Sequence, residues 1–199
     1  MSAKKALHDA PPKKVAAELG RLGDGYAWLE RKMVDWGDGV PKETFVPGQP
    51  DGAFVLGFLD DGKIPLVHQY RLFNGGWSYE LPGGIIDETD SPEDAALREL
   101  EEEAGYRAAE IEPLLSYWTN SGLRCRSSLF VARKLVKTKQ DLDDGERELE
   151  VVLVTPTHLW EMVMDGTITH AATIIATLLA KERGFLKIER RGLKKAHPF

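Results

Sequence analysis

The sequence has a single cysteine, Cys125, among its 199 residues, so no disulfide can form within the chain. A lone cysteine is typical of a reducing compartment, and it excludes both a disulfide-stapled fold and a zinc site built from cysteines. The five histidines form no pair at the spacing of metal ligands. No apolar run approaches the roughly 18 residues of a membrane span, and the N-terminal segment lacks the apolar centre of a signal peptide. We therefore expect a cytoplasmic protein with no membrane partner.

The sequence also lacks an excess of positive charge, with 26 lysines and arginines against 32 aspartates and glutamates. The formal net charge is -6, the opposite of the basic excess expected of a nucleic-acid-binding protein. Residues 181–199 hold seven basic and two acidic residues. They lack an interleaved aromatic platform, so a solvated tail is the better interpretation. We expect no nucleic-acid partner, and an acidic protein that binds an anionic ligand has to recruit local arginines or metal ions.

The order of patterns along the chain predicts two domains. Residues 1–50 read as a polar arm, frayed up to about residue 20, and a small β unit of two strands around a turn at 37–39. In residues 51–199, strands lie on both sides of a central helix and helices follow at the end. The fold class is therefore α+β, with a mixed β-sheet between helices (α/β/α). The expected strands cover about 53–59, 64–70, 75–81, 111–118, 128–136 and 150–155. The expected helices cover about 92–104, 156–165 and 170–183.

One segment concentrates negative charge. Residues 87–103 contain nine carboxylates and one arginine, which gives a formal charge of -8. Ser91 and Pro92 make a good helix start, and Asp94 completes a capping-box pattern. Gly105 is a natural stop. The segment therefore predicts a short, capped and strongly acidic helix.

Three carboxylates of this helix, Glu99, Glu102 and Glu103, fall on one face beside an apolar stripe, because residues three and four apart are neighbours. Like charges at these spacings repel, so the face is either simply solvated or receives a cation. Oxygen ligands without histidine or cysteine favour Mg²⁺ or Mn²⁺ over zinc. The Gly-Gly turn at 83–84 lets backbone carbonyls approach the same ion, which favours the metal site over the solvated face.

The same residues resemble the signature of the Nudix hydrolases. That signature is Gly, five residues, Glu, seven residues, then Arg-Glu-apolar-X-Glu-Glu-X-Gly-apolar. Gly84 opens it here, and RELEEEAGY at 98–106 closes it with the right spacing. Asp90 stands where the first glutamate is expected, and its shorter side chain weakens a supporting contact without removing the main metal ligands. The resemblance implies a Nudix fold for residues 51–199.

The chain around the signature resembles the ADP-ribose pyrophosphatase branch of that family. The signature, also called the Nudix box, is preceded here by LVHQYR and WSYELPGG, as in that branch. A β unit also precedes the catalytic domain, and residues 149–180 are similar to the closing strand and two helices of the branch. Ser121-Gly122 replaces the Pro-Gly pair that the branch commonly has after the box. The substrate therefore stays open between ADP-ribose or a related nucleoside diphosphate sugar and GDP-mannose, a dinucleoside polyphosphate or an oxidised nucleotide.

The resemblance implies hydrolysis of a diphosphate assisted by two or three Mg²⁺ ions. Glu99 and Glu103 would be the main metal ligands, with Glu102 next and the Gly83 carbonyl as a further one. Arg98 would orient these glutamates rather than touch the substrate.

In this branch the general base often lies on a loop before the last strand, which is here residues 141–150. Glu148 is the first choice for this base and Glu146 the second. The alternative is a solvated loop whose acids do nothing. A mobile acidic loop that closes over the substrate fits both interpretations.

Five residues are predicted to contact the substrate. Arg71, Arg124 and Arg126 would bind phosphates, because arginine forms bidentate phosphate contacts. Trp28 and Trp36, in the N-terminal unit, would stack on a nucleobase. The ordinary alternatives are surface charge for the arginines, and core or dimer-interface packing for the tryptophans.

The N-terminal unit also implies a homodimer, because this unit exchanges between subunits in the branch that the chain resembles. A function of a different class is a Nudix-fold module that binds a nucleotide sugar without turnover. The presence of Glu99, Glu102 and Glu103 disfavours it. An isopentenyl diphosphate isomerase on the same fold needs a suitably placed reactive cysteine, whereas Cys125 lies downstream of the box.

Overall fold

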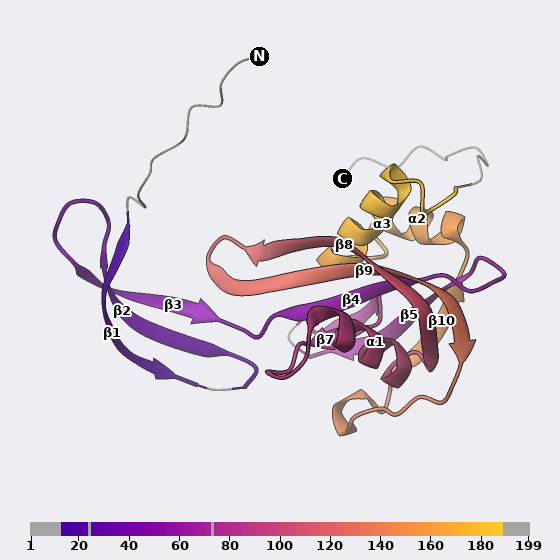
Figure 1. Ribbon diagram of the computed structural model, residues 1–199, viewed down its shortest axis with the longest axis horizontal. Coiled ribbons are helices and arrows are strands. Elements are labelled where there is room, and N and C mark those ends of the chain that lie inside the picture. The colour runs from indigo at the N-terminus through magenta and orange to yellow at the C-terminus, as the bar shows by residue number, and fades with distance from the viewer. Residues whose placement is uncertain (1–12, 24, 73, 189–199) are drawn as a thin grey trace, which may run out of the picture. The chain divides into compact units, whose positions relative to one another are not determined.

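The computed structural model describes residues 13–23, 25–72 and 74–188, which form two compact units (Figure 1). The first unit holds the chain up to Pro50 together with Trp118–Cys125, and the second holds Asp51–Tyr117 and the chain from Arg126 onward. The regular elements described in the first unit are all β-strands, whereas the three α-helices of the described residues belong to the second unit. In the described part of the chain, no helix is long and apolar enough to cross a membrane.

The first unit is built on an antiparallel sheet of β1 (Lys14–Leu22), β2 (Trp28–Asp35) and β3 (Lys42–Gly48). The predicted strand pair around residues 37–39 is confirmed as β2 and β3. The prediction of a frayed arm up to about residue 20 is wrong for β1, while residues 1–12 lie outside the described part. All nine residues of β1 are exposed, so its pairing with β2, and not an alternating apolar pattern, makes it a strand.

The second unit contains two sheets. In the first, β9 (Leu123–Lys137) pairs in parallel with β4 (Gly52–Gly57), which pairs antiparallel with β7 (Gly83–Ile85). The long strand β8 (Tyr106–Asn120) pairs with β9. The other sheet is antiparallel, in the order β10 (Glu150–Val154), β5 (Ile64–Arg71) and β6 (Gly76–Glu80). The strands β4 and β5 are consecutive in the sequence but belong to different sheets.

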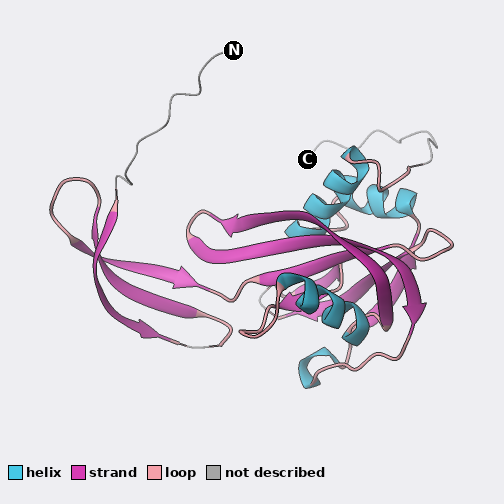
Figure 2. Ribbon diagram, in the orientation of Figure 1, coloured by secondary structure: helices cyan, strands magenta, loops and turns pink. Residues whose placement is uncertain are grey.

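Helices cover both faces of the sheets of this unit, as Figure 2 shows. They are α1 (Pro92–Glu102), α2 (Pro156–Met164) and α3 (Ala171–Glu182). Leu56 of β4 packs in the apolar cluster that α2 and α3 cover, whereas its neighbour Val55 packs in the cluster that α1 covers. Successive strand residues point to opposite faces, so one strand serves both cores. The α/β/α arrangement is confirmed.

Candidate active site

Helix α1 starts at Pro92, as the sequence predicts, and ends at Glu102, two residues before the predicted end. Hydrogen bonds fix both ends. The Asp94 N–H donates to Ser91 Oγ at 3.1 Å, and the Ser91 N–H donates to Asp94 Oδ2 at 3.4 Å. After the helix, Gly105 adopts a φ of 67° and donates its N–H to the Glu101 carbonyl at 2.9 Å. A left-handed residue at this position favours glycine. The two ends together set the directions of the glutamates between them.

Two of these glutamates are buried against the β6–β7 turn. Glu103 is 2% exposed and accepts a hydrogen bond from the Gly83 N–H at 2.7 Å. Glu99 is 8% exposed, and a Cβ on Gly84 would lie 2.6 Å from its Oε1 atom. Only glycine allows so close an approach of the turn to the carboxylate. The carboxylates of Glu99 and Glu103 are thus enclosed between α1 and the β6–β7 turn. The hydrogen bond from Gly83 to Glu103 also helps to fix the position of that turn.

Arg98 links most of the surrounding acids. Its Nη1 atom lies 2.9 Å from Glu99 Oε1 and 3.1 Å from Glu102 Oε2, and its Nη2 atom donates to the Ile85 carbonyl at 3.0 Å. Its Nε atom is 3.4 Å from Asp90 Oδ2. Asp90 therefore reaches the arginine although it is shorter than the glutamate of the family pattern. These contacts suit the predicted orienting role of Arg98.

Nearby cations do not fully balance the buried carboxylates. Burial raises the pKa of Glu99 to about 7, against the opposing effect of Arg98. Burial also raises the pKa of Glu103 well above its usual value, although the Gly83 N–H acts in the other direction. A divalent cation would relieve such a site, and an all-oxygen donor set suits Mg²⁺ or Mn²⁺. In the described part of the chain no three acidic, histidine or cysteine side chains converge into a metal cage, so an ion would also need backbone, water or substrate oxygens.

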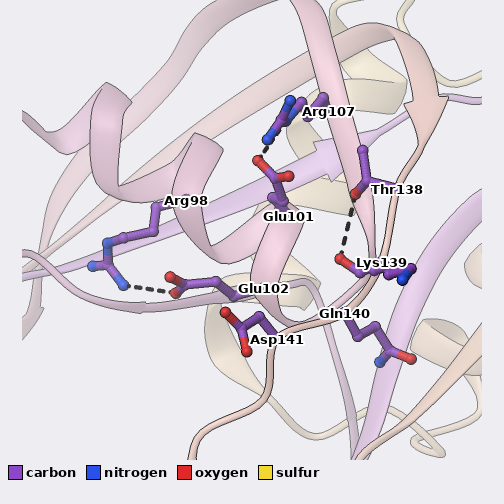
Figure 3. A pocket seen from close by; sticks show the side chains of 8 residues that line it. All are labelled: Arg98, Glu101, Glu102, Arg107, Thr138, Lys139, Gln140 and Asp141. Carbon is purple, nitrogen blue, oxygen red and sulfur yellow. Dashed lines mark hydrogen bonds and ion pairs between the residues drawn. The ribbon is translucent and has the colours of Figure 1, made fainter.

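The chain after β9 is tied to the C-terminal end of α1. The Gln140 side chain donates from Nε2 to the Glu103 carbonyl at 2.6 Å, and the Asp141 N–H donates to the Glu102 carbonyl at 3.0 Å. These bonds satisfy carbonyls that have no partner within the helix. An open pocket of about 610 Å³ lies here, lined by residues of α1 and of the segment 138–141 and by Arg107 at the start of β8 (Figure 3). The acidic loop thus starts from a fixed point beside the metal-ligand candidates.

The acidic loop brings Glu146 into the electrostatic field of the site. Glu146 ends a short 3-10 helix, η1 (Asp144–Glu146), and is half-buried. It is among the charges that raise the pKa values of Glu99 and Glu103. Glu148 is exposed and is not among the main influences on those pKa values. Its partial burial and its influence on the two buried glutamates are consistent with Glu146, the second-choice base of the sequence analysis, and the choice between Glu146 and Glu148 stays a prediction.

Arg71 is held by a carboxylate that the sequence analysis did not single out. Its Nε and Nη2 atoms donate to the two Glu80 oxygens at 3.0 and 2.7 Å. The Glu80 side chain is 3% exposed and that of Arg71 is 41% exposed. The hydrogen bond with Glu80 is the main cause that raises the pKa of Arg71, and Glu103 and Glu146 add to it. Arg71 therefore lies near the buried glutamates, with part of its guanidinium open to an anion.

The other predicted substrate contacts are not brought to this site by any described interaction. Arg124, Trp28 and Trp36 belong to the first unit. There, Arg124 Nη1 and Trp28 Nε1 donate to the same Glu30 oxygen at 3.3 and 3.2 Å, and Trp36 is 47% exposed. Arg126 belongs to the second unit, on β9, and is exposed. The roles of these four residues stay predictions.

Comparisons with known proteins agree with this site. The NUDIX domain model matches residues 48–191. An ADP-ribose pyrophosphatase of Bacillus subtilis is 31% identical over 86% of this chain and 92% of its own. A GDP-mannose pyrophosphatase of Yersinia enterocolitica is 30% identical over 77% of this chain and 85% of its own. A crystal structure of an ADP compounds hydrolase shares the fold, with a TM-score of 0.75 and 19% identity over 89% of this chain and 96% of its own. The chain belongs to the Nudix hydrolases, in the part of the family that includes ADP-ribose pyrophosphatases.

Proposed function

We propose that this Nudix hydrolase cleaves the diphosphate of ADP-ribose or a related nucleoside diphosphate sugar, with Mg²⁺ or Mn²⁺ as cofactor. The observation that carries the proposal is the buried pair Glu99 and Glu103 beside the Gly83–Gly84 turn, with Arg71 close by. A buried anionic pair that needs a cation, next to an arginine with free donors, suits the diphosphate of an anionic substrate. The similarity to an ADP-ribose pyrophosphatase supports the choice of substrate.

Each residue has a definite part in the proposed reaction. Glu99, Glu103, Glu102 and the Gly83 carbonyl would hold the metal ions, and Arg98 would keep the glutamates oriented. Bound divalent ions neutralise the developing charge on the phosphates and lower the pKa of the attacking water.

The bond changes then involve two further residues. Arg71 would bind a phosphate oxygen while Glu80 holds its guanidinium in place. Glu146 would accept the proton of the attacking water as the water oxygen bonds to phosphorus and the bridging P–O bond breaks. With ADP-ribose as substrate, the products are AMP and ribose 5-phosphate. Glu148 remains the alternative base.

The decisive experiment measures product release from a substrate panel with and without Mg²⁺. The panel holds ADP-ribose, GDP-mannose, diadenosine polyphosphates, NADH and 8-oxo-dGTP. We expect preferred, Mg²⁺-dependent cleavage of ADP-ribose. Glu103→Gln should abolish this turnover and leave the fold intact. The matched control is Glu101→Gln on the same helix, because Glu101 pairs outward with Arg107 at 2.7 Å. Equal rates for wild type and Glu103→Gln would refute the metal assignment.

Two other outcomes of the panel point to other functions. Preferred cleavage of GDP-mannose is the second candidate, because a GDP-mannose pyrophosphatase is 30% identical to this chain. Binding of Mg²⁺ and a nucleotide sugar without turnover would favour the non-catalytic module instead.

We also propose a homodimer that forms through the first unit. This unit exposes several large apolar side chains on its three strands and on the connections between them. A second copy would cover Val15, Leu19, Leu22, Tyr26, Trp36, Val40 and Phe45. Contiguous exposed apolar surface is a common sign of an interaction site. Sedimentation equilibrium should give the mass of a dimer, and a Phe45→Glu variant should shift it towards the monomer. A wild-type protein that stays monomeric at high concentration would overturn this proposal.

A cytoplasmic location completes the proposal. It is supported by the single cysteine of the sequence, Cys125, which allows no disulfide within the chain, since chains without disulfides are usual in reducing compartments. Fractionation of cells that express the full chain should recover the protein with cytoplasmic markers, and recovery with a secreted fraction would contradict it.

A further inference from the structure

The first turn of α3 is connected to the turn that carries Gly83. Thr173 is completely buried, and its Oγ1 atom accepts a hydrogen bond from the Leu81 N–H at 2.9 Å. The two residues are 92 positions apart in the sequence. Leu81 itself is 1% exposed, so this backbone donor has no access to water. A buried N–H without an acceptor is unfavourable, and Thr173 therefore fixes where β6 ends.

The Leu81–Thr173 bond lies only two residues from a contact of the active site. The Gly83 N–H donates to Glu103 at 2.7 Å, and the Gly83 carbonyl is a proposed metal ligand. The turn is thus held at both ends, by α3 at Leu81 and by α1 at Gly83. Loss of the first bond would free the turn to move relative to Glu103.

The same turn of α3 also lies behind the arginine that is proposed to bind phosphate. His170 contacts Thr173 Oγ1 through Nδ1 at 2.9 Å, and its Nε2 atom lies 3.8 Å from Glu80 Oε2. Glu80 in turn makes the two hydrogen bonds to Arg71. Phe54 packs edge-on against the His170 ring at 5.2 Å and fills the space beside it. His170 therefore limits how far Glu80 can withdraw from Arg71.

We propose that Thr173 and His170 are positioning residues, which hold the Leu81–Gly84 turn and the Glu80–Arg71 pair in the geometry that catalysis needs. We call the contacts of Thr173 with Leu81 and of His170 with Glu80 the clamp. The inference rests on the proposed function for its effect on turnover, but the clamp itself is a property of the metal-free chain. Groups that orient metal ligands without touching the metal typically change metal affinity or activity by about 10- to 100-fold when they are replaced.

The test compares Thr173→Val with Thr173→Ser and with a matched control, Thr177→Val. Valine keeps the shape of threonine but cannot accept the Leu81 hydrogen bond, whereas serine can. Thr177 is equally buried on the same helix, and its hydroxyl donates to the Thr173 carbonyl at 2.7 Å. The control therefore loses a buried hydrogen bond in α3 without touching the turn.

Three measurements are made on each protein. The first is kcat and KM on whichever panel substrate the wild type cleaves. The second is Mn²⁺ affinity by calorimetry. The third is amide hydrogen exchange of residues 76–85 without metal. We expect Thr173→Val to lower kcat and weaken Mn²⁺ binding by about 10- to 100-fold, and to speed exchange of this segment. Thr173→Ser and Thr177→Val should stay close to the wild type.

The outcomes separate this inference from the proposed function. Equal behaviour of Thr173→Val and Thr177→Val in all three measurements overturns the clamp, even if the enzyme is active. A wild type without turnover overturns the proposed function, while the Mn²⁺ and exchange measurements still decide on the clamp. If Thr173→Val does not fold, exchange of the Leu81 amide in the wild type decides, because a freely exchanging amide contradicts the bond.

His170 has its own test. His170→Leu should raise KM about tenfold or more, because His170 lies against the Glu80 that holds Arg71. It should weaken Mn²⁺ binding less than Thr173→Val does, because Thr173 and not His170 accepts the Leu81 hydrogen bond. The matched control is His158→Leu, since His158 is exposed on α2 and lies 3.8 Å from Glu161. An unchanged KM in His170→Leu would refute the role of His170.

Discussion

Replacement of Glu99 by glutamine should stabilise the metal-free protein, although it removes a proposed metal ligand. The pKa of Glu99 is about 7 in the folded chain, against an ordinary value of 4.5. Between these two pH values the folded state keeps a proton that the unfolded state has lost. The free energy of unfolding therefore falls as the pH rises through this window. The full effect, reached above pH 7, is about 3 kcal/mol.

The magnitude follows from the position of the side chain. Glu99 is 8% exposed, so solvent screens it little and the conversion to free energy is reasonable. Its nearest cation, Arg98 at 2.9 Å, already lowers the pKa, and the burial effect still dominates. Glutamine is neutral and nearly the same size, and its amide oxygen can keep the bond to Arg98. The gain over wild type should be below about 1 kcal/mol at pH 5 and approach about 3 kcal/mol at pH 8.5.

Urea unfolding in EDTA between pH 5.0 and 8.5 measures this difference directly. Glu101→Gln is the control, because Glu101 lies on the same helix and pairs outward with Arg107. Its difference from wild type should not grow with pH. Added Mg²⁺ should stabilise the wild type more than Glu99→Gln, since binding to the folded state alone adds stability. A Glu99→Gln protein that is less stable than wild type at pH 8.5 in EDTA would refute the reasoning.

Three further changes test other parts of the site. Glu146→Gln should lower kcat by about 10²- to 10⁴-fold with little change in KM, while Glu148→Gln stays within a few-fold, and the reverse order would move the base to Glu148. Gly84→Ala places a Cβ 2.6 Å from the Glu99 carboxylate, so calorimetry should detect weaker Mn²⁺ binding, and unchanged affinity would contradict the close approach. Arg71→Lys should lower kcat/KM about tenfold or more, because hydrogen bonds to charged groups contribute about 1.5–3 kcal/mol, and a wild-type value would exclude a phosphate contact.

The helix of the active site could be predicted in detail because its signals are local. The cap at Ser91, the stop at Gly105 and the spacing of Glu99 and Glu103 all lie within one short segment. The capping box and the helical period act over three or four residues. The same short spacing carries the family resemblance, which the comparisons confirm.

The sequence could not rank the two candidate bases or predict the strand β1, because both depend on contacts between residues far apart in the chain. Glu146 and Glu148 look alike in a polar loop, and only the fold places Glu146 near Glu99. The strand β1 was missed because all of its residues are exposed. In both cases the deciding partner lies on another element.

The sequence by itself determined the family of the protein and the local features of its candidate site: a capped acidic helix, a Gly-Gly turn and the candidate oxygen ligands Glu99, Glu102 and Glu103. Only the tertiary structure decided which side chains support that site. Glu80 meets Arg71 through the register of two strands, and Thr173 meets Leu81 across 92 residues. Such contacts depend on how strands and helices pack, and the spacing of residues along one segment contains no record of that packing.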